Sequence, residues 1–290
     1  MAGPRADTWS MADPRAGAVL TWPARQDGGS RFVLDSRYRL LGLIAETPSA
    51  RVWRAHAVQD GRTVAIKERF AGSDRELSFT RRVAGLKGVV PVFEVTPADG
   101  RLWIVMALMA TDLGHDVERA RGDDPRGLPD PEVAGLGLKL AKALRRVHRA
   151  GVVHGDVTPS NVLLDPTGRP HLSDFGFAGP VGGRGTRRDG TVDISLPFAA
   201  PERLGGSRLR PPADVYSLGA TLYHAAEGRP PFARRSPWSA VYATLHEEPD
   251  PFRIPREPAL TATIRAMLTR RPRQRPTLDD VIAALRPLTG

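Results

Sequence analysis

The sequence contains no cysteine among its 290 residues. Disulfide bonds, thiolate metal sites and a thiol nucleophile are therefore excluded. It also has no apolar run long enough to span a bilayer, and the longest such run, residues 102–110, suits a buried strand. The first residues lack the apolar core of a signal peptide, so we expect a cytoplasmic protein that does not associate with a membrane.

Aromatic residues are scarce as well, at 6% of the chain, whereas glycine and proline are plentiful with 29 and 27 copies. This composition predicts many loops in a chain that can bury a sizeable core, in one large or two smaller domains. The net charge is +10 and comes mostly from arginine. Because the arginines are dispersed and not gathered in a stripe with interleaved aromatics, we consider a nucleic-acid surface the less favoured interpretation.

Residues 154–164 form a short loop followed by an apolar run, and the loop carries Asp156 and Asn161 five positions apart. A second carboxylate, Asp174, stands just before Phe175 and Gly176. Phosphoryl transfer with Mg²⁺ needs one carboxylate to position the attacking hydroxyl, and a carboxamide and a carboxylate to hold the metal. We therefore predict Asp156 as the base or orienting residue, and Asn161 and Asp174 as Mg²⁺ ligands.

These residues resemble the ordered signature of the protein kinase family. The chain reads H-G-D-V-T-P-S-N at 154–161, D-F-G at 174–176, A-P-E at 200–202, D-V-Y-S-L-G at 214–219 and R-P-T at 275–277. The resemblance covers about residues 38–285. It implies an α+β, two-lobed protein-kinase-like fold with a small β-rich N-lobe and a mainly helical C-lobe.

The resemblance divides the chain into three parts. Residues 1–36 are rich in alanine, glycine, proline and arginine without periodicity, and we predict a disordered or loosely docked leader there. Residues 37–109 would form the N-lobe and the hinge, beginning with strand-like runs joined by turns. Residues 110–290 would form the C-lobe, in which apolar spacing predicts a long helix from Asp130 to about Ala150.

The resemblance also implies an ATP site between the lobes. Lys67 ends the V-A-I-K match at 64–67 and would hold the α- and β-phosphates, with Glu76 on the next helix bracing it and Glu68 as the fallback partner. Within the C-lobe, Asp214 would accept backbone N–H groups of the catalytic loop, and Arg275 would pair with Glu202. The remaining nucleotide-binding positions would be Val52, Ala65, Met106, Ala107, Met109 and Leu163.

The glycine-rich loop of the family is absent. Its three usual glycine positions are Ala45, Thr47 and Ala50, with Glu46 and Pro48 between them. Glycine permits close backbone approach to phosphates and proline has no N–H to offer, so each lost contact would cost nucleotide binding about 1–2 kcal/mol. We expect the roof over ATP to be loose, bent differently or ordered by something else.

Two further departures lie in the catalytic loop. The usual arginine is Gly155, so activity should not be switched on by a phosphate, on Thr186 or Thr191, that this arginine would grip. The usual lysine is Thr158, and the loss of its charge would slow the chemistry by about one to a few powers of ten.

The favoured function is a Ser/Thr protein kinase, slow or atypically regulated, that uses ATP and Mg²⁺ to phosphorylate a protein hydroxyl. A pseudokinase with weak or no nucleotide binding, acting on a regulated partner, is the first alternative because the phosphate roof is altered. The H-G-D loop with its downstream asparagine also resembles small-molecule phosphotransferases, which form the second alternative. The sequence names neither the protein substrate nor the oligomeric state.

Overall fold

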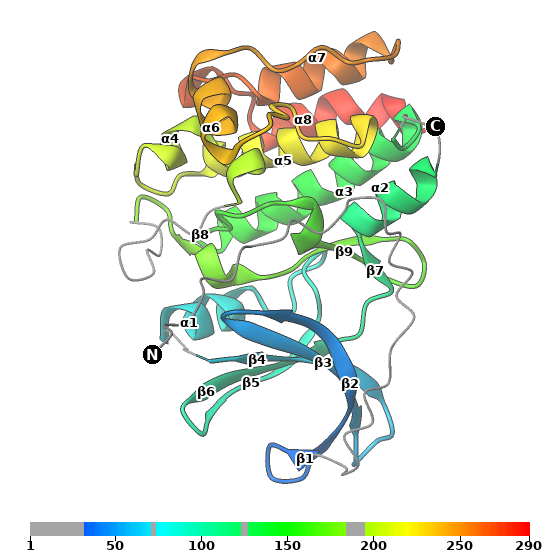
Figure 1. Cartoon of the computed structure of the whole chain (residues 1–290), viewed down its shortest axis with the longest axis vertical. Coiled ribbons are helices and arrows are strands. Elements are labelled where there is room, and N and C mark those ends of the chain that lie inside the picture. Colours follow the sequence, from blue (N-terminus) through cyan, green and yellow to red (C-terminus); the bar gives the residue numbers. More distant parts are fainter. Residues whose placement is uncertain (1–31, 71–73, 123–126, 184–194) are drawn as a thin grey trace, which may run out of the picture.

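The computed structural model describes residues 32–70, 74–122, 127–183 and 195–290, and its two lobes are shown in Figure 1. The small lobe is a six-stranded antiparallel sheet in the order β1-β2-β3-β4-β6-β5. One helix, α1 (Asp74–Val83), packs against it. The strands are β1 (Phe32–Val33), β2 (Tyr38–Thr47), β3 (Ala50–Ala57), β4 (Thr63–Arg69), β5 (Val92–Ala98) and β6 (Arg101–Ala107).

The first strand lies within the stretch predicted as a leader. β1 pairs with β2, with Phe32 opposite Arg39, and both Val33 and Leu34 are buried. Residues 32–36 therefore belong to the small lobe, because β1 extends its sheet and the side chains of Val33 and Leu34 join its core. The remainder of the predicted leader lies outside the described residues.

Apolar side chains cover both faces of this sheet. Val64, Ile66 and Val105 belong to one buried cluster, whereas Leu102 and Ile104 belong to another that includes Leu77 of α1. Successive side chains of a strand point to opposite faces, so an apolar run without alternation is what a strand buried on both sides requires. β4 is such a strand, and it delivers Lys67 to the inner side of the lobe.

The large lobe is mainly helical (Figure 1). Its long helix α3 runs from Asp130 to Arg149, as the apolar spacing predicted, and buries Leu140, Leu144 and Val147 against α5 and α8. The other helices are α2 (Leu113–Arg121), α4 (Pro201–Leu204), α5 (Pro211–Glu227), α6 (Pro237–His246), α7 (Pro258–Met267) and α8 (Leu278–Leu285). Short 3₁₀ helices are η1 (Pro159–Asn161), η2 (Phe175–Phe177), η3 (Leu196–Phe198), η4 (Pro272–Gln274) and η5 (Arg286–Leu288).

Two small sheets place the loops of the large lobe that face the small lobe. β7 (Thr111–Asp112), β9 (Val162–Leu164) and β10 (Pro170–Leu172) form one, in the order β10-β9-β7. β8 (Val152–Val153) and β11 (Gly179–Pro180) form the other. The segment between β8 and β9 carries Asp156, and the segment between β10 and β11 carries Asp174, so the strand pairs bring these carboxylates to one region. Among the described residues, no helix combines the length and the apolar character that crossing a bilayer needs.

A partly buried histidine in α5 makes the stability of the large lobe depend on pH. Burial first, and then the charge of Arg121, lower the pKa of His224 to about 4, below its ordinary value near 6.5. The unfolded state therefore binds more protons between these values, and stability should fall as the pH drops through this window. We expect His224→Gln to remove up to about 3 kcal/mol of that loss, measured as the difference between denaturant-unfolding free energies across the window.

The same change at the exposed His246 is the matched control and should leave the pH slope unchanged. An identical slope in wild type and His224→Gln would contradict the prediction.

Candidate active site

The catalytic loop is anchored by a carboxylate from a distant helix. Asp214 of α5 is fully buried, and its two oxygens accept the backbone N–H groups of His154 and Gly155, each at 2.8 Å. The Nε2 atom of His148 lies 2.7 Å from the same carboxylate. Burial alone would raise the pKa of Asp214, but the hydrogen bond and charge of His148 hold it below its ordinary value. The loop conformation thus rests on an ionised buried aspartate, as the resemblance implied.

Asp156 and Asn161 lie in direct contact on this loop. The Nδ2 atom of Asn161 donates to Oδ2 of Asp156 at 2.8 Å and to its backbone carbonyl at 2.9 Å. Because the amide nitrogen faces Asp156, the amide oxygen of Asn161 is the atom left to bind a metal. Burial raises the pKa of Asp156, and the hydroxyl of Ser195 and the charge of His154 partly oppose that rise. A carboxylate with a raised pKa is a stronger proton acceptor once it is ionised.

The two lobes meet at an ion pair between predicted site residues. Nζ of Lys67 on β4 lies 2.7 Å from Oδ1 of Asp174, the N-cap residue of η2. Asp174 adopts a left-handed backbone with φ of 57°, and such conformations cluster at functional sites. Burial would raise the pKa of Asp174, but Lys67 lowers it to about 2, so the carboxylate is ionised at neutral pH. Its side chain remains 33% exposed and accessible to a ligand.

The structure describes only one of the two glutamates predicted as partners of Lys67. Glu76 lies on α1, but its side chain is outside the described part of the chain, so the Lys67–Glu76 contact stays a prediction. Glu68 is fully buried and accepts a hydrogen bond from Nε1 of Trp53 at 3.0 Å while pairing with Arg101. Because neighbouring strand residues point to opposite faces, the side chain of Glu68 lies on the face of the sheet opposite to that of Lys67.

The predicted adenine-binding residues gather where the sheet meets the connector between the lobes. Ala65 lies opposite Met106 across β4 and β6, and Val52 lies opposite Lys67 across β3 and β4. Ala107 ends β6, and the chain then passes Met109 to reach Ala110, whose N–H donates to the carbonyl of Leu164 at 2.8 Å. Leu163 precedes that acceptor on β9. The fold thus places Ala65 beside Met106 and leads the connector past Met109 to β9, and contact with a nucleotide stays a prediction.

The loop that replaces the glycine-rich roof is the two-residue turn of a hairpin between β2 and β3. Thr47 lies opposite Ala50, and its Oγ1 atom accepts the N–H groups of Ala50 at 3.1 Å and of Ser49 at 3.4 Å. Glu46 pairs with Arg51 at 2.7 Å, so the negative charge expected near the phosphates has a counter-ion. The hairpin is thus closed by contacts among its own side chains, and its position over a nucleotide stays a prediction.

Gly155 has a conformational reason to be glycine. Its φ is +79°, and a Cβ atom there would lie 2.8 Å from the carbonyl oxygen of Phe177 and 3.2 Å from the side chain of Leu209. An arginine therefore does not fit this loop conformation.

The second departure in the catalytic loop, Thr158, is buried, and its Oγ1 atom lies 3.0 Å from the Oγ atom of Ser160. Thr186 and Thr191 are outside the described residues.

We expect Gly155→Ala to lower the free energy of unfolding by about 2–4 kcal/mol, since it combines backbone strain with a steric clash. Gly168→Ala is the matched control because Gly168 has a similar φ of +73° with nothing within 4 Å of its added Cβ. That control should cost only about 1 kcal/mol in the same denaturant titration. Equal costs for the two variants would show that the predicted clash is relieved by movement of the loop.

Another ion pair joins the A-P-E segment to the segment that precedes α8. The guanidinium of Arg275 binds both oxygens of Glu202, with each N–O distance 2.7 Å. The guanidinium also lies over the ring of Tyr216, 4.9 Å from its centroid. This is the pair that the resemblance implied, and it fixes α4 next to the N-terminal end of α5.

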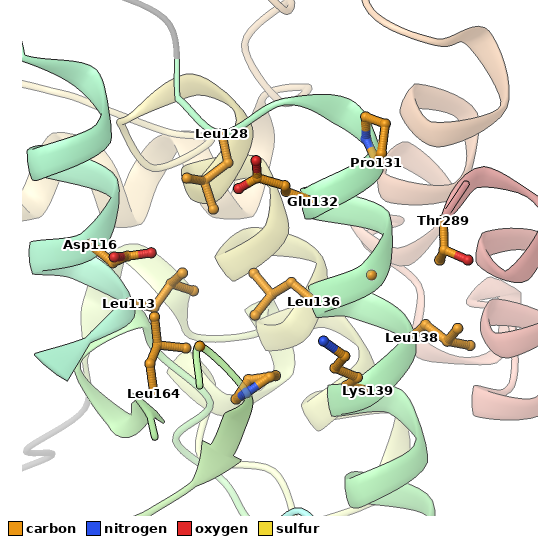
Figure 2. A pocket seen from close by; sticks show the side chains of 13 residues that line it. Leu113, Asp116, Leu128, Pro131, Glu132, Leu136, Leu138, Lys139, Leu164 and Thr289 are labelled. Carbon is orange, nitrogen blue, oxygen red and sulfur yellow. The ribbon is translucent and has the colours of Figure 1, made fainter. Parts of the chain in front are cut away.

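A pocket of about 380 Å³ lies in the large lobe, away from the site described above. Figure 2 shows the side chains of Leu113 on α2, Leu136 on α3 and Leu164 on β9 converging in it. None of the predicted catalytic or nucleotide-binding residues lines it. We therefore assign the candidate active site to the region between the lobes and not to this pocket.

Some site residues were missed by sequence reasoning. Ser195 was not among the predicted site residues, yet its hydroxyl is close enough, from a distant segment, to lower the pKa of Asp156. Arg69 adds positive charge near Asp174. His148 contacts Asp214 from the end of α3. Each contact joins residues far apart in the chain, and no local pattern in the sequence marks it.

The antiparallel small lobe, the helical large lobe and the Lys67–Asp174 pair between them define a two-lobed kinase-like domain. Residues 38–285 match the protein kinase domain family. The chain therefore belongs to the protein kinase domain family, in agreement with the resemblance and with nearly the same boundaries.

Curated relatives carry the same domain in longer proteins. The chain is 36% identical over 271 residues to the DNA damage-responsive serine/threonine-protein kinase RqkA of Deinococcus radiodurans, which covers 87% of this chain and 39% of RqkA. It is 37% identical over 225 residues to the serine/threonine-protein kinase PknK of Mycobacterium tuberculosis, covering 76% of this chain and 20% of PknK. For PknA of the same organism the identity is 30% over 275 residues, covering 87% and 62%. The chain thus spans less than two thirds of the length of these relatives.

Proposed function

We propose that this domain is a Ser/Thr protein kinase that transfers the γ-phosphoryl group of ATP to a protein hydroxyl. The observation that carries the proposal is the joint placement of the Lys67–Asp174 pair, at 2.7 Å, and of Asp156 held by Asn161 on the adjacent loop. The choice of serine and threonine as acceptors is supported by the names of RqkA, PknK and PknA, all serine/threonine-protein kinases.

Each charged group has a distinct part in this reaction. Lys67 would bind the α- and β-phosphates, and Asp156 would orient the acceptor hydroxyl and take its proton. Asp174 and the amide oxygen of Asn161 are hard oxygen donors that suit Mg²⁺, and Asp174 is already ionised. When bound, the metal supplies charge neutralisation and alignment of the phosphates. Most of the rate would then come from positioning and electrostatic stabilisation.

The proposed reaction should be slow for a protein kinase. The hairpin at Pro48 cannot offer the backbone N–H groups of a glycine-rich loop, and Thr158 leaves the catalytic loop without its usual cation. Both changes remove stabilisation of the phosphates, and we expect a rate lower by about one to a few powers of ten.

The test is phosphate transfer from labelled ATP by the full chain, with Mg²⁺ present or chelated, followed by identification of the modified amino acid. We expect label on serine or threonine and a Mg²⁺-dependent rise in Tm with ATP. Lys67→Met should lose both signals. The absence of label on the chain and on generic acceptor proteins, together with no change in Tm, would overturn the proposal in favour of a pseudokinase.

A further inference from the structure

Arg69, the last residue of β4, lies on the same face of the sheet as the residues assigned to the nucleotide. Side chains of a strand alternate between the two faces, so Ala65, Lys67 and Arg69 follow one another on the inner face of β4. Ala65 lies opposite Met106 near the connector, and Nζ of Lys67 lies 2.7 Å from Asp174. Arg69 is thus the next position in a series that leads from the predicted adenine site past the predicted phosphate-binding lysine.

The same position borders the hairpin that replaces the glycine-rich roof. Arg69 lies opposite Ala50 across β3 and β4, and Ala50 is one of the three replaced glycine positions. The N–H of Phe70 donates to the carbonyl of Ser49 at 3.2 Å, which ties the end of β4 to the turn of the hairpin. Arg69 is therefore placed on the roof side of the site, beyond Lys67 in the direction of the turn.

The charge of Arg69 also acts on the carboxylate expected to bind the metal. Burial would raise the pKa of Asp174, whereas Lys67 and, to a smaller extent, the charge of Arg69 lower it. The guanidinium is thus close enough to Asp174 to attract it, and the Arg69 side chain is only half-buried. An anion bound between Asp174 and the roof would face two positive charges.

Other groups that could hold the terminal phosphate of ATP are missing or occupied. Pro48 has no N–H to offer, and Arg51 of the same hairpin pairs with Glu46. Residues 154–161 of the catalytic loop include neither lysine nor arginine. The transferred phosphoryl group carries charge on its oxygens that must be stabilised, and a guanidinium presents a planar fork of donors that matches two of them.

We propose that Arg69 binds the terminal phosphate of ATP and replaces part of the stabilisation lost with the glycine-rich loop and with the lysine that Thr158 replaces. The inference rests on the proposed kinase function, which supplies the nucleotide. Lys67 holds the α- and β-phosphates, and Arg69 holds the γ-phosphate from the roof side. Because ADP lacks the group that Arg69 contacts, this residue makes the site prefer the triphosphate.

The test compares the affinities of the full chain for ADP and for a non-hydrolysable, imido-bridged ATP analogue, each with Mg²⁺, by titration calorimetry. We expect Arg69→Met to weaken binding of the analogue about tenfold and binding of ADP less than about twofold. Arg69→Lys should recover part of the loss because it keeps the charge. Arg62→Met is the matched control, since Arg62 is an exposed arginine just before the other end of β4, and both affinities should match wild type.

A side chain that only supported the fold would affect both nucleotides alike. Equal weakening of ADP and the analogue by Arg69→Met would therefore overturn the inference, as would an unchanged affinity for the analogue or no binding by wild type. Should Arg69→Met fail to fold, Arg69→Gln and Arg69→Lys give the same comparison.

The titration needs no catalysis, so it separates this inference from the proposed function. An Arg69-dependent preference for the analogue in a chain that never transfers phosphate would refute only the kinase function. Phosphate transfer by wild type, together with an affinity for the analogue that Arg69→Met leaves unchanged, would refute only the role of Arg69.

Discussion

Replacing Asp156 with asparagine is expected to lower the rate of phosphate transfer by about 10²–10⁴-fold while leaving nucleotide binding intact. Asparagine has the same shape but cannot take a proton from the acceptor hydroxyl. The cation and carboxylate expected to hold the phosphates and metal, Lys67 and Asp174, form their own pair and are not altered. The measurements are the initial rate of transfer and the ATP-induced rise in Tm, which should persist in the variant.

The pH profile gives a second readout of the same variant. Burial raises the pKa of Asp156, so the wild-type rate should decline on the acid side as this carboxylate takes up a proton. The residual rate of Asp156→Asn should lack that decline. Asp99→Asn, the same change in an exposed turn of the small lobe, is the matched control and should behave as wild type. Full activity in Asp156→Asn would remove Asp156 from the reaction.

Replacing Arg275 with methionine is expected to cost about 3–5 kcal/mol of unfolding free energy. The Arg275 side chain is fully buried, at 0% exposure, and binds both oxygens of Glu202. It also donates to the backbone carbonyls of Thr269 at 2.7 Å and Pro212 at 2.8 Å. Removing it leaves the Glu202 carboxylate and these carbonyls without their donor, and the uncompensated buried charge makes this loss larger than that of a surface pair.

The measurement is denaturant unfolding in a double-mutant cycle with Glu202→Gln. The cost of Arg275→Met should shrink by about 1–3 kcal/mol when Glu202 is already neutral, because no charge is then left unpaired. Arg273→Met, at a neighbouring exposed position, should change stability by less than about 0.5 kcal/mol. A cost below about 1 kcal/mol for Arg275→Met would show that the pair does not stabilise the large lobe.

Sequence reasoning foresaw features that follow from family motifs or from apolar periodicity. It placed Asp156 and Asn161 five positions apart on one loop, but it did not predict their direct contact. The α3 helix follows from apolar spacing. The Glu202–Arg275 pair spans much of the large lobe, and it was accessible only because both residues matched a family motif.

The hairpin at Thr47 shows where the sequence was insufficient. The sequence showed that the three glycines are missing, but it did not show the contacts that close the hairpin. These contacts are the Thr47 hydroxyl, which accepts two N–H groups, and the Glu46–Arg51 ion pair across the strands. Such contacts depend on the register of β2 and β3, which a list of residues does not define. Gly155 is similar: its substitution was seen as a missing arginine, and only the position of Phe177 explains why a side chain is excluded.

The sequence by itself determined the family, the α+β two-lobed class and the types of residue available for phosphoryl transfer, because these follow from ordered motifs and apolar periodicity. Only the tertiary structure decided which charges meet and which stay apart. It brought Lys67 to within 2.7 Å of Asp174 across the lobes and His148 of α3 to within 2.7 Å of the buried Asp214. The physical reason is that ion pairing and burial depend on distances between segments remote in the chain, which only packing sets.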